Sequence, residues 1–519
     1  MKATTFLFRR PLLIRLTLIL VFLLAVILRF YWMSQKEMPY GDELTSVCLA
    51  YNHPGWGAYT YDTAVTYQGD SLRNGFFSDQ TTGWTGVWED LRTLHTDNRD
   101  LSHASLYYMA LRIALWGSHT LQDVLWQGFA LNLLFFALSF WLLALLLIRL
   151  FPGRYLWVSA ILACVFWNPA TVANTLLLRE YQLAETCFVA WTCFIALLFR
   201  RLQDGTSLVR PSLMLSGALL AAAVCSTGYF NALYPVLTLL CIVLHAWRVR
   251  AFRNWPFFVG IALLCPLFCY LAYQGFFNFL TDVRTVEVAG KMQGEGFFRN
   301  LYDTLFACAY ILTLRGFTPV WIAGGLSACL YLLFRKRPLQ AGISLSRLYV
   351  ALWGSAVLWI LAILYLATWK FTRYISPALP VFLAGVFSLL LSYCRRVGRR
   401  YTVFLFAAFL IYAFWDYPME YLERRNSRFW PEQTSCVYLY APDAEASNSL
   451  NLLVPYLGDR QQCRLFTTPE QLFSFTAGSD TLWVVGGSED ASLRSWPGFL
   501  EERFFNGWQS FYLYTPHNP

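Results

Sequence analysis

Charged residues are scarce in this sequence: Asp, Glu, Lys and Arg make up 14% of 519 residues, whereas hydrophobic residues make up 57%. The mean hydropathy of +0.43 lies far above that of a soluble domain. This composition excludes an ordinary soluble fold and indicates an integral membrane protein. Aromatic residues reach 18%, which suits the membrane–water interface and would equally suit stacking on sugar rings.

Signatures of metal and nucleic-acid binding are also lacking. None of the 13 cysteines belongs to a C-x-x-C pair, and most lie in apolar runs, where cysteine behaves as a small hydrophobic residue. Those in apolar runs are Cys164, Cys187, Cys193, Cys241, Cys265, Cys269 and Cys329. The net charge of +9 falls in short clusters between apolar runs, so we expect no nucleic-acid partner. Cys436 and Cys463 stand in a polar C-terminal segment, and whether they form a disulfide stays open.

Apolar runs near the length of a membrane-spanning helix, roughly 20 residues, recur along the chain and predict about eleven spans. The runs are 11–31, 122–148, 155–175, 181–199, 211–230, 231–247, 255–275, 317–334, 348–368, 374–393 and 401–415. The first follows Lys2, Arg9 and Arg10, exceeds a signal-peptide core in length and lacks a small-residue cleavage site. It is therefore expected to be a retained helix.

Basic residues concentrate in alternate loops between these runs. Such loops contain Arg149 and Arg154; Arg200, Arg201 and Arg210; Arg248, Arg250 and Arg253; Arg335, Lys336, Arg337 and Arg347; and Arg395, Arg396, Arg399 and Arg400. By the positive-inside rule these loops and the N-terminus are cytoplasmic. We expect a multi-pass inner-membrane protein whose C-terminal segment is periplasmic.

Three polar regions then lie outside the cell interior: the long first loop, a loop at 276–316 and the C-terminal segment from about Asp416. Residues 32–121 form a long first loop, and within it the apolar stretch 104–117 is too short to span and suits a helix lying on the membrane surface. The C-terminal segment contains short apolar runs typical of strands, which predict a small α/β domain. The expected domains are thus an all-α membrane domain over 1–415, including the first loop, and a periplasmic α/β domain over 416–519.

Three polar motifs lie at the predicted outer ends of spans. Asp42 and Glu43 follow the first span; their carboxylates could cap a helix, bind a cation or act as a general base. Arg179, Glu180, Tyr181 and Glu185 lie at the fourth span, either as a structural pair or around a cavity. Lys370, Arg373 and Tyr374 lie between the ninth and tenth runs, and the two cations suit a lipid phosphate or simple interfacial anchoring.

In combination these motifs resemble the GT-C glycosyltransferases, in particular the protein O-mannosyltransferases and the bacterial aminoarabinose transferases of lipid A. The likeness rests on GDE at 41–43, SHASLYY at 102–108, LLLREYQL at 176–183 and FTRYISPALP at 371–380. It covers the membrane portion in order. The sequence departs from the family where Ala104 and Ser105 replace prolines, and where Leu177 stands in place of an acid before Arg179.

The resemblance implies an enzyme that transfers a sugar from a polyprenyl-phosphate-linked donor to a hydroxyl of a glycan, lipid or protein. Asp42 would be the base, supported by Glu43. The donor phosphate and its lipid would contact Arg179, Tyr181, Lys370, Arg373, Tyr374, His103 and Tyr107, with Glu180 and Glu185 behind them. No ligand spacing supports a metal, and a requirement for a divalent cation stays open.

Alternatives from other classes remain. An O-antigen polymerase or ligase shares the lipid-linked chemistry, but its large functional loop usually comes late in the chain. A lipid-linked-glycan flippase or transporter would show charged or Gly/Pro-broken helices at the membrane midplane together with internal repeats, and the sequence shows neither feature clearly. A non-catalytic scaffold would need none of the ordered motifs.

Overall fold

The computed structural model describes residues 4–53, 65–81, 83–100, 103–281, 283–292, 296–314, 348–367, 370–397, 419–424, 436–440, 451–476, 484–486, 499–505 and 510–516. The chain forms two compact units. The first comprises Met1–Trp32, Asp100–Tyr107 and Asn132–Glu420, and the second Met33–Arg99, Tyr108–Leu131 and Tyr421–Pro519. The predicted domain boundary at 415–416 lies outside the described residues and stays a prediction.

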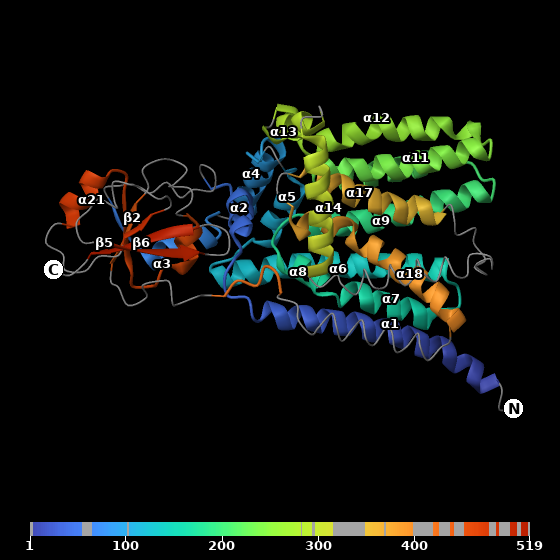
Figure 1. The fold of residues 1–519 in the computed structure, drawn as a ribbon, viewed down its shortest axis with the longest axis horizontal. Helices are drawn as coiled ribbons and strands as arrows, with labels where there is room; N and C mark the ends of the chain where they lie inside the picture. The colour runs from blue at the N-terminus through green and yellow to red at the C-terminus, as the bar shows by residue number, and fades with distance from the viewer. Residues whose placement is uncertain are drawn as a thin grey trace. The chain divides into compact units, whose positions relative to one another are not determined.

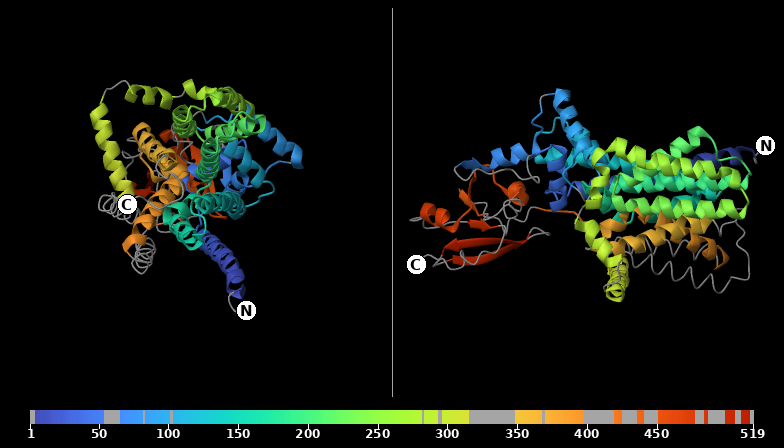
Figure 2. Two further views of the ribbon diagram at one scale, coloured as in Figure 1. Left: turned by 90° about the vertical axis from the view of Figure 1, so that its right-hand side faces the viewer. Right: turned by 90° about the horizontal axis from the view of Figure 1, so that it is seen from above.

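The first unit is a helical bundle, whose long helices run alongside one another in Figure 1 and are seen end-on in the left view of Figure 2. Helices α1 and α6 extend into the second unit. The α-helices are α1 (Thr4–Met33), α6 (Leu121–Leu150), α7 (Tyr155–Phe166), α8 (Pro169–Leu176), α9 (Tyr181–Gln203), α10 (Pro211–Cys225), α11 (Leu233–Arg248), α12 (Trp255–Ala272), α13 (Val283–Met292), α14 (Phe297–Leu314), α17 (Ser355–Leu366) and α18 (Leu379–Val397). Shorter helical turns are η1 (Tyr229–Ala232), η2 (Phe252–Asn254), η3 (Gln274–Thr281), η4 (Val350–Gly354) and η5 (Thr372–Ala378).

Membrane-spanning helices account for most of this bundle. Among the described residues, 6 helices are long and apolar enough to cross a membrane, or 7 if the bent pair α7–α8 counts as one. Every predicted run inside the described part contains a helix, although those in 211–230 and 348–368 are shorter than a full span. The predicted multi-pass architecture is confirmed. The runs 317–334 and 401–415 lie outside the described residues, so the total of about eleven spans and the orientation stay predictions.

The predicted run 155–175 is not one straight helix. It divides into α7 and α8, whose axes differ by 59°. The local sequence explains the break: the Asn168 side chain accepts a hydrogen bond from the amide of Ala170 at 3.0 Å, and Pro169 occupies the first turn of α8. Asn is a good N-cap and Pro is favoured at the first helical position, so a new helix starts here inside an apolar stretch.

The second unit combines helices from the first loop with a six-stranded mixed sheet of order β1-β3-β2-β4-β6-β5. Strands β3, β2 and β4 are parallel, and the other pairings are antiparallel. Its elements are α2 (Gly41–Ala50), β1 (Thr66–Gln68), α3 (Gly69–Phe77), α4 (Gly83–Thr96), α5 (Leu106–Ala114), β2 (Cys436–Tyr440), η6 (Asn451–Tyr456), β3 (Gln462–Phe466), α21 (Pro469–Thr476), β4 (Val484–Gly486), β5 (Phe499–Phe505) and β6 (Ser510–Pro516). The C-terminal segment is therefore a mixed α/β structure. The first loop contributes its edge strand β1, which the sequence did not indicate.

Cys436 and Cys463 lie on the adjacent parallel strands β2 and β3, and both thiols are free. Cys436 is paired with Gln462, so Cys463, one residue further along, faces the opposite side of the sheet. Burial, with a smaller contribution from Cys436, raises the pKa of the Cys463 thiol to about 12. A disulfide between these two residues is not formed.

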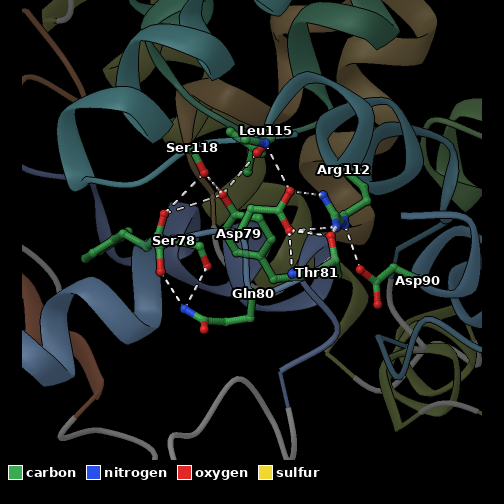
Figure 3. Close-up of polar contacts among 11 residues, drawn as sticks. Ser78, Asp79, Gln80, Thr81, Asp90, Arg112, Leu115 and Ser118 are labelled. Atoms are coloured by element: carbon green, nitrogen blue, oxygen red, sulfur yellow. Dashed lines mark hydrogen bonds and ion pairs between the residues drawn. The ribbon is translucent and has the colours of Figure 1, made fainter. Parts of the chain in front are cut away.

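An ion-pair cluster joins three segments of the second unit around Arg112 of α5. The Arg112 guanidinium donates to Asp79 at 3.0 Å and to Asp90 of α4 at 2.7 Å, and Figure 3 shows the two carboxylates on different sides of it. Asp79 also accepts hydrogen bonds from the Thr81 hydroxyl at 2.6 Å and the Gly117 amide at 3.0 Å. The cluster fixes α4 against α5, the helix predicted at 104–117. The location of α5 on the membrane surface stays a prediction.

The two acids of the Arg112 cluster respond differently to pH. Burial opposes the charge of Asp79, but the hydrogen bonds from Thr81 and Gly117 and the charge of Arg112 outweigh it, so the pKa of Asp79 is lowered. At Asp90 burial is the larger effect and raises the pKa despite Arg112. A carboxyl group whose pKa is lower in the folded state stabilises the fold at pH values above its unfolded-state pKa, which is 3.8 for Asp79. This stabilisation is lost as the pH falls through the pKa of the folded state.

We therefore predict that Asp79→Asn lowers the stability of the protein at neutral pH by about 1–3 kcal/mol, because Arg112 loses a charged partner. The loss should shrink on acidification below the unfolded-state pKa, since protonated Asp79 no longer differs in charge from Asn. Thermal unfolding of the purified protein across this pH range measures both effects. Glu89→Gln on the exposed face of α4 is the control, and an equal loss at acidic and neutral pH would contradict the assignment.

Candidate functional site

The residues predicted for the site fall in both units. Asp42 and Glu43 belong to the second unit, whereas His103, Tyr107, Arg179, Glu180, Tyr181, Glu185, Lys370, Arg373 and Tyr374 belong to the first. Each group is described within its own unit.

In the first unit, the predicted Arg179 and Glu180 lie in a short break between α8 and α9. Asn132 of α6 donates to the carbonyl oxygens of Thr175 at 3.3 Å and Leu177 at 2.7 Å. The Tyr107 hydroxyl in turn donates to the Asn132 side chain at 3.2 Å. The break thus has its freed carbonyl groups satisfied, as buried backbone requires. Tyr107 acts here through Asn132, a residue that the sequence analysis missed.

Four polar side chains meet at this break. His103 lies 2.8 Å through Nδ1 from Asp100, and 3.1 Å through Nε2 from the Arg179 guanidinium. Glu180 approaches His103 at 3.5 Å and Arg179 at 3.4 Å. Arginine only donates, so in its contact with Arg179 the Nε2 atom of His103 is the acceptor. Asp100 was also missed; its signal is the spacing Asp100-x-x-His103 on one turn.

Arg373 approaches the same region from η5, which packs against α9. The Arg373 guanidinium lies 4.6 Å from the Phe371 ring centre and 5.5 Å from that of Tyr374. The Tyr374 ring meets the Tyr181 ring edge-on at 6.3 Å. The charges of Arg373 and Arg179 both act on the Tyr181 hydroxyl. The predicted residues Arg179, Tyr181, Arg373 and Tyr374 therefore lie together, and both arginines are buried.

Lys370 has different partners in this structure. Its ammonium donates to the Leu364 carbonyl at 2.6 Å and to the Thr304 hydroxyl at 3.4 Å. Leu364 belongs to the last turn of α17, where a cation is favoured by the helix dipole. The contact fixes the end of α17 against α14. A role of Lys370 toward a phosphate stays a prediction.

Glu185 belongs to a second buried network, further along α9. Its carboxylate accepts hydrogen bonds from Ser139 and Asn174, each at 3.0 Å. Arg29 of α1 lies within its electrostatic influence. The Arg29 guanidinium donates to the carbonyl oxygens of Phe166 at 3.0 Å and Thr171 at 3.1 Å. These are carbonyls on the two sides of the α7–α8 break, so Arg29 satisfies groups that the bend releases.

Asp42 and Glu43 occupy the first turn of α2 and differ sharply. Glu43 is fully buried; its carboxylate accepts from Lys36 at 2.6 and 2.8 Å and from the Tyr40 amide at 2.5 Å. Asp42 is half-buried. Glu423 completes the group: burial raises its pKa, Lys36 opposes this, and Glu43 adds to it. Glu43 is thus a capping and ion-pair residue here, while Asp42 is the more accessible carboxylate. Lys36 and Glu423 were not predicted.

Comparison with known proteins finds matches only among solved structures. No protein-family model and no characterised relative matches the sequence. Two crystal structures of ArnT from Cupriavidus metallidurans, in the apo state and bound to undecaprenyl phosphate, are similar along 96% of this chain and 97% of theirs. In each the identity is 12% and the TM-score 0.46. ArnT is a lipid A aminoarabinose transferase of the GT-C type that the motifs resemble. A TM-score of this size carries no inference about activity.

The Arg29 network yields a prediction about stability. Arg29→Met should destabilise the protein by about 3–5 kcal/mol, because it removes the donor to the Phe166 carbonyl and the cation that offsets the buried charge of Glu185. Unfolding of the detergent-purified variant, followed by tryptophan fluorescence, measures the change. Arg200→Met, at a side chain that is 75% exposed on α9, is the control. A variant as stable as the parent protein would refute the role assigned to Arg29.

Proposed function

We propose that this protein is a GT-C-type integral membrane glycosyltransferase. It transfers a sugar from a polyprenyl-phosphate-linked donor to a hydroxyl of a glycan, lipid or protein acceptor at the outer face of the inner membrane. The observation that carries the proposal is the presence of two buried guanidinium groups, Arg179 and Arg373, whose charges both act on Tyr181 at the start of α9.

Buried arginines in a membrane protein are costly and mark a functional cavity more often than a structural one. Arginine recognises phosphate through two parallel N–H donors, which suits a lipid phosphate at the end of a membrane helix. The aromatic rings of Tyr374 and Phe371 hold Arg373 in place. Asp100 and His103 orient Arg179. The two arginines are therefore positioned before a ligand arrives, as anion recognition requires.

The chemistry follows from the leaving group. When the sugar leaves its donor, the lipid phosphate gains negative charge, and the guanidinium groups of Arg179 and Arg373 stabilise it. The acceptor hydroxyl loses its proton to a carboxylate, for which Asp42 is the candidate. Attack opposite the departing phosphate inverts the anomeric centre. No nucleotide-sugar or ATP is required on the outer face, because the donor arrives already activated by its lipid.

A lipid-linked-glycan flippase is the second candidate, and one observation favours it. The helix pair α7–α8 is broken at Pro169 inside the bundle, and it contacts the buried charged side chains of Arg29 on α1 and Glu185 on α9. Such helices are typical of transporters. The sequence analysis found no clear sign of them, and the structure corrects that prediction. Reconstituted vesicles distinguish the two: sugar appearing covalently on an acceptor supports transfer, whereas movement of the intact donor across the bilayer supports flipping.

Replacing either arginine by lysine tests the phosphate site. Arg179→Lys and Arg373→Lys keep the charge but lose the two-pronged donor, so each should weaken binding of polyprenyl phosphate about 10- to 100-fold. Native mass spectrometry of the purified protein with added polyprenyl phosphate measures the affinity. Arg200→Lys, at an exposed side chain on α9, is the control. Unchanged affinity in both variants would remove the phosphate site and with it the proposal.

Adjacent carboxylates provide a second, internally controlled test. Asp42→Asn should reduce sugar transfer by about 10²–10⁴-fold, the usual contribution of a general base, without changing the unfolding temperature. Glu43→Gln should instead lower the unfolding temperature, because Lys36 loses its buried charged partner. Transfer is measured with a labelled donor in reconstituted vesicles. An active Asp42→Asn enzyme would show that another group takes the proton.

A further inference from the structure

A cluster of three cysteines lies in the first unit, away from the residues of the proposed site. Cys225 ends α10, and Cys265 and Cys269 lie one turn apart on α12. All three Sγ atoms lie within 4.8 Å of one another. Three or more histidine, cysteine or acidic side chains can hold a metal ion when their ligand atoms lie this close together. Among the residues that the structure describes, the three cysteines form such a group.

We propose that Cys225, Cys265 and Cys269 form a binding site for a thiophilic divalent cation such as Zn²⁺. Zinc binds thiolate sulfur at about 2.3 Å, which places three sulfur ligands about 4 Å apart. The observed sulfur separations need only a small rotation of the side chains to reach this value. Three protein ligands leave a fourth position of the tetrahedron for water or another donor.

The packing of α10 against α12 fixes the three thiols. At Gly217 a Cβ atom would lie 2.8 Å from the Ile261 side chain, and at Gly260 it would lie 1.9 Å from that of Met214. Both contacts cross between the two helices, so glycine lets the backbones approach closely. Cys269 adds a contact from its thiol to the Ala222 carbonyl at 3.9 Å. The sulfur atoms thus converge from two helices held in a defined register.

The cysteine ligands and their apolar surroundings favour a soft metal ion. Cys225 is 7% exposed and Cys269 1%, and they pack in one apolar cluster with Ala222, Tyr273 and Phe276. Hard cations need oxygen ligands, whereas thiolates select zinc and its heavier relatives. Burial in an apolar shell also favours a low net charge, and a divalent ion offsets two of the three thiolate charges. A divalent thiophilic ion meets both conditions.

Two of the cysteines occupy final helical turns. Cys225 is the last residue of α10, and Cys269 lies within the last turn of α12, which ends at Ala272. These two thiols therefore lie near the ends of both helices and not in their middle turns. The sequence analysis treated Cys265 and Cys269 as small hydrophobic residues, because the third ligand is distant in sequence and no C-x-x-C pair is present.

Titration of the full-length, detergent-purified protein with Cd²⁺ tests the site. The protein is reduced and freed of reductant under anaerobic conditions, and ultraviolet thiolate-to-metal absorption and equilibrium dialysis report binding. We expect one tightly bound Cd²⁺ per chain, displaced by Zn²⁺. The double variant C265S/C269S should lose the band, and Cys225→Ser should weaken binding at least tenfold. The double variant C187S/C193S on α9 is the matched control and should bind as the parent protein does.

A protection experiment keeps the test decisive if a serine variant does not fold. Cd²⁺ should protect Cys225, Cys265 and Cys269 of the parent protein from alkylation, mapped by mass spectrometry, while Cys187 and Cys193 react as before. Three results would overturn the proposal: no band in the parent protein, a band that persists in C265S/C269S, or a disulfide joining Cys225 to Cys265 or Cys269 in the protein isolated without reductant.

Discussion

An ionised side chain among membrane helices must have its charge and its hydrogen-bonding groups satisfied within the protein, because the hydrocarbon around it offers neither. Much of this structure follows from that constraint. Arg29 lies fully buried in the bundle and donates to two backbone carbonyls at the α7–α8 break. The arginine donates hydrogen bonds to carbonyl groups at the break, which stabilises the bent backbone. The same carbonyl groups serve as acceptors for the buried guanidinium.

The same rule shapes the second unit. Lys36 is buried and lies against Glu43, with Glu423 acting on the same region. Arg112 is buried between Asp79 and Asp90. In both places one cation draws together segments that are distant in sequence. Such ion pairs add little net stability compared with an apolar core, but losing one partner is costly, so they fix one arrangement of the segments.

Features governed by length and composition could be predicted from the sequence. An apolar run of about 20 residues must form a helix if it lies in a membrane, and the described runs do so. Several contacts that depend on a partner elsewhere in the chain were missed. Arg29 lies inside the run 11–31, and its acceptors at the α7–α8 break lie more than a hundred residues away. Asn132, Asp100 and strand β1 were missed for the same reason. The α7–α8 bend did have a local signal in Asn168 and Pro169. The signal was overlooked because the run 155–175 has the length of one membrane-spanning helix.

The two buried arginines Arg29 and Arg179 differ in the kind of partner that they contact, which bears on the phosphate-binding role proposed for Arg179. Arg29 is bonded chiefly to backbone carbonyls, which cannot turn away, so moving it would leave buried acceptors unsatisfied. Arg179 is instead in contact with the side chains of His103 and Glu180. Side chains can rotate and exchange partners, so an arriving phosphate can replace them at the guanidinium without opening the backbone. This exchange is what a binding site must permit, and a purely structural network prevents it.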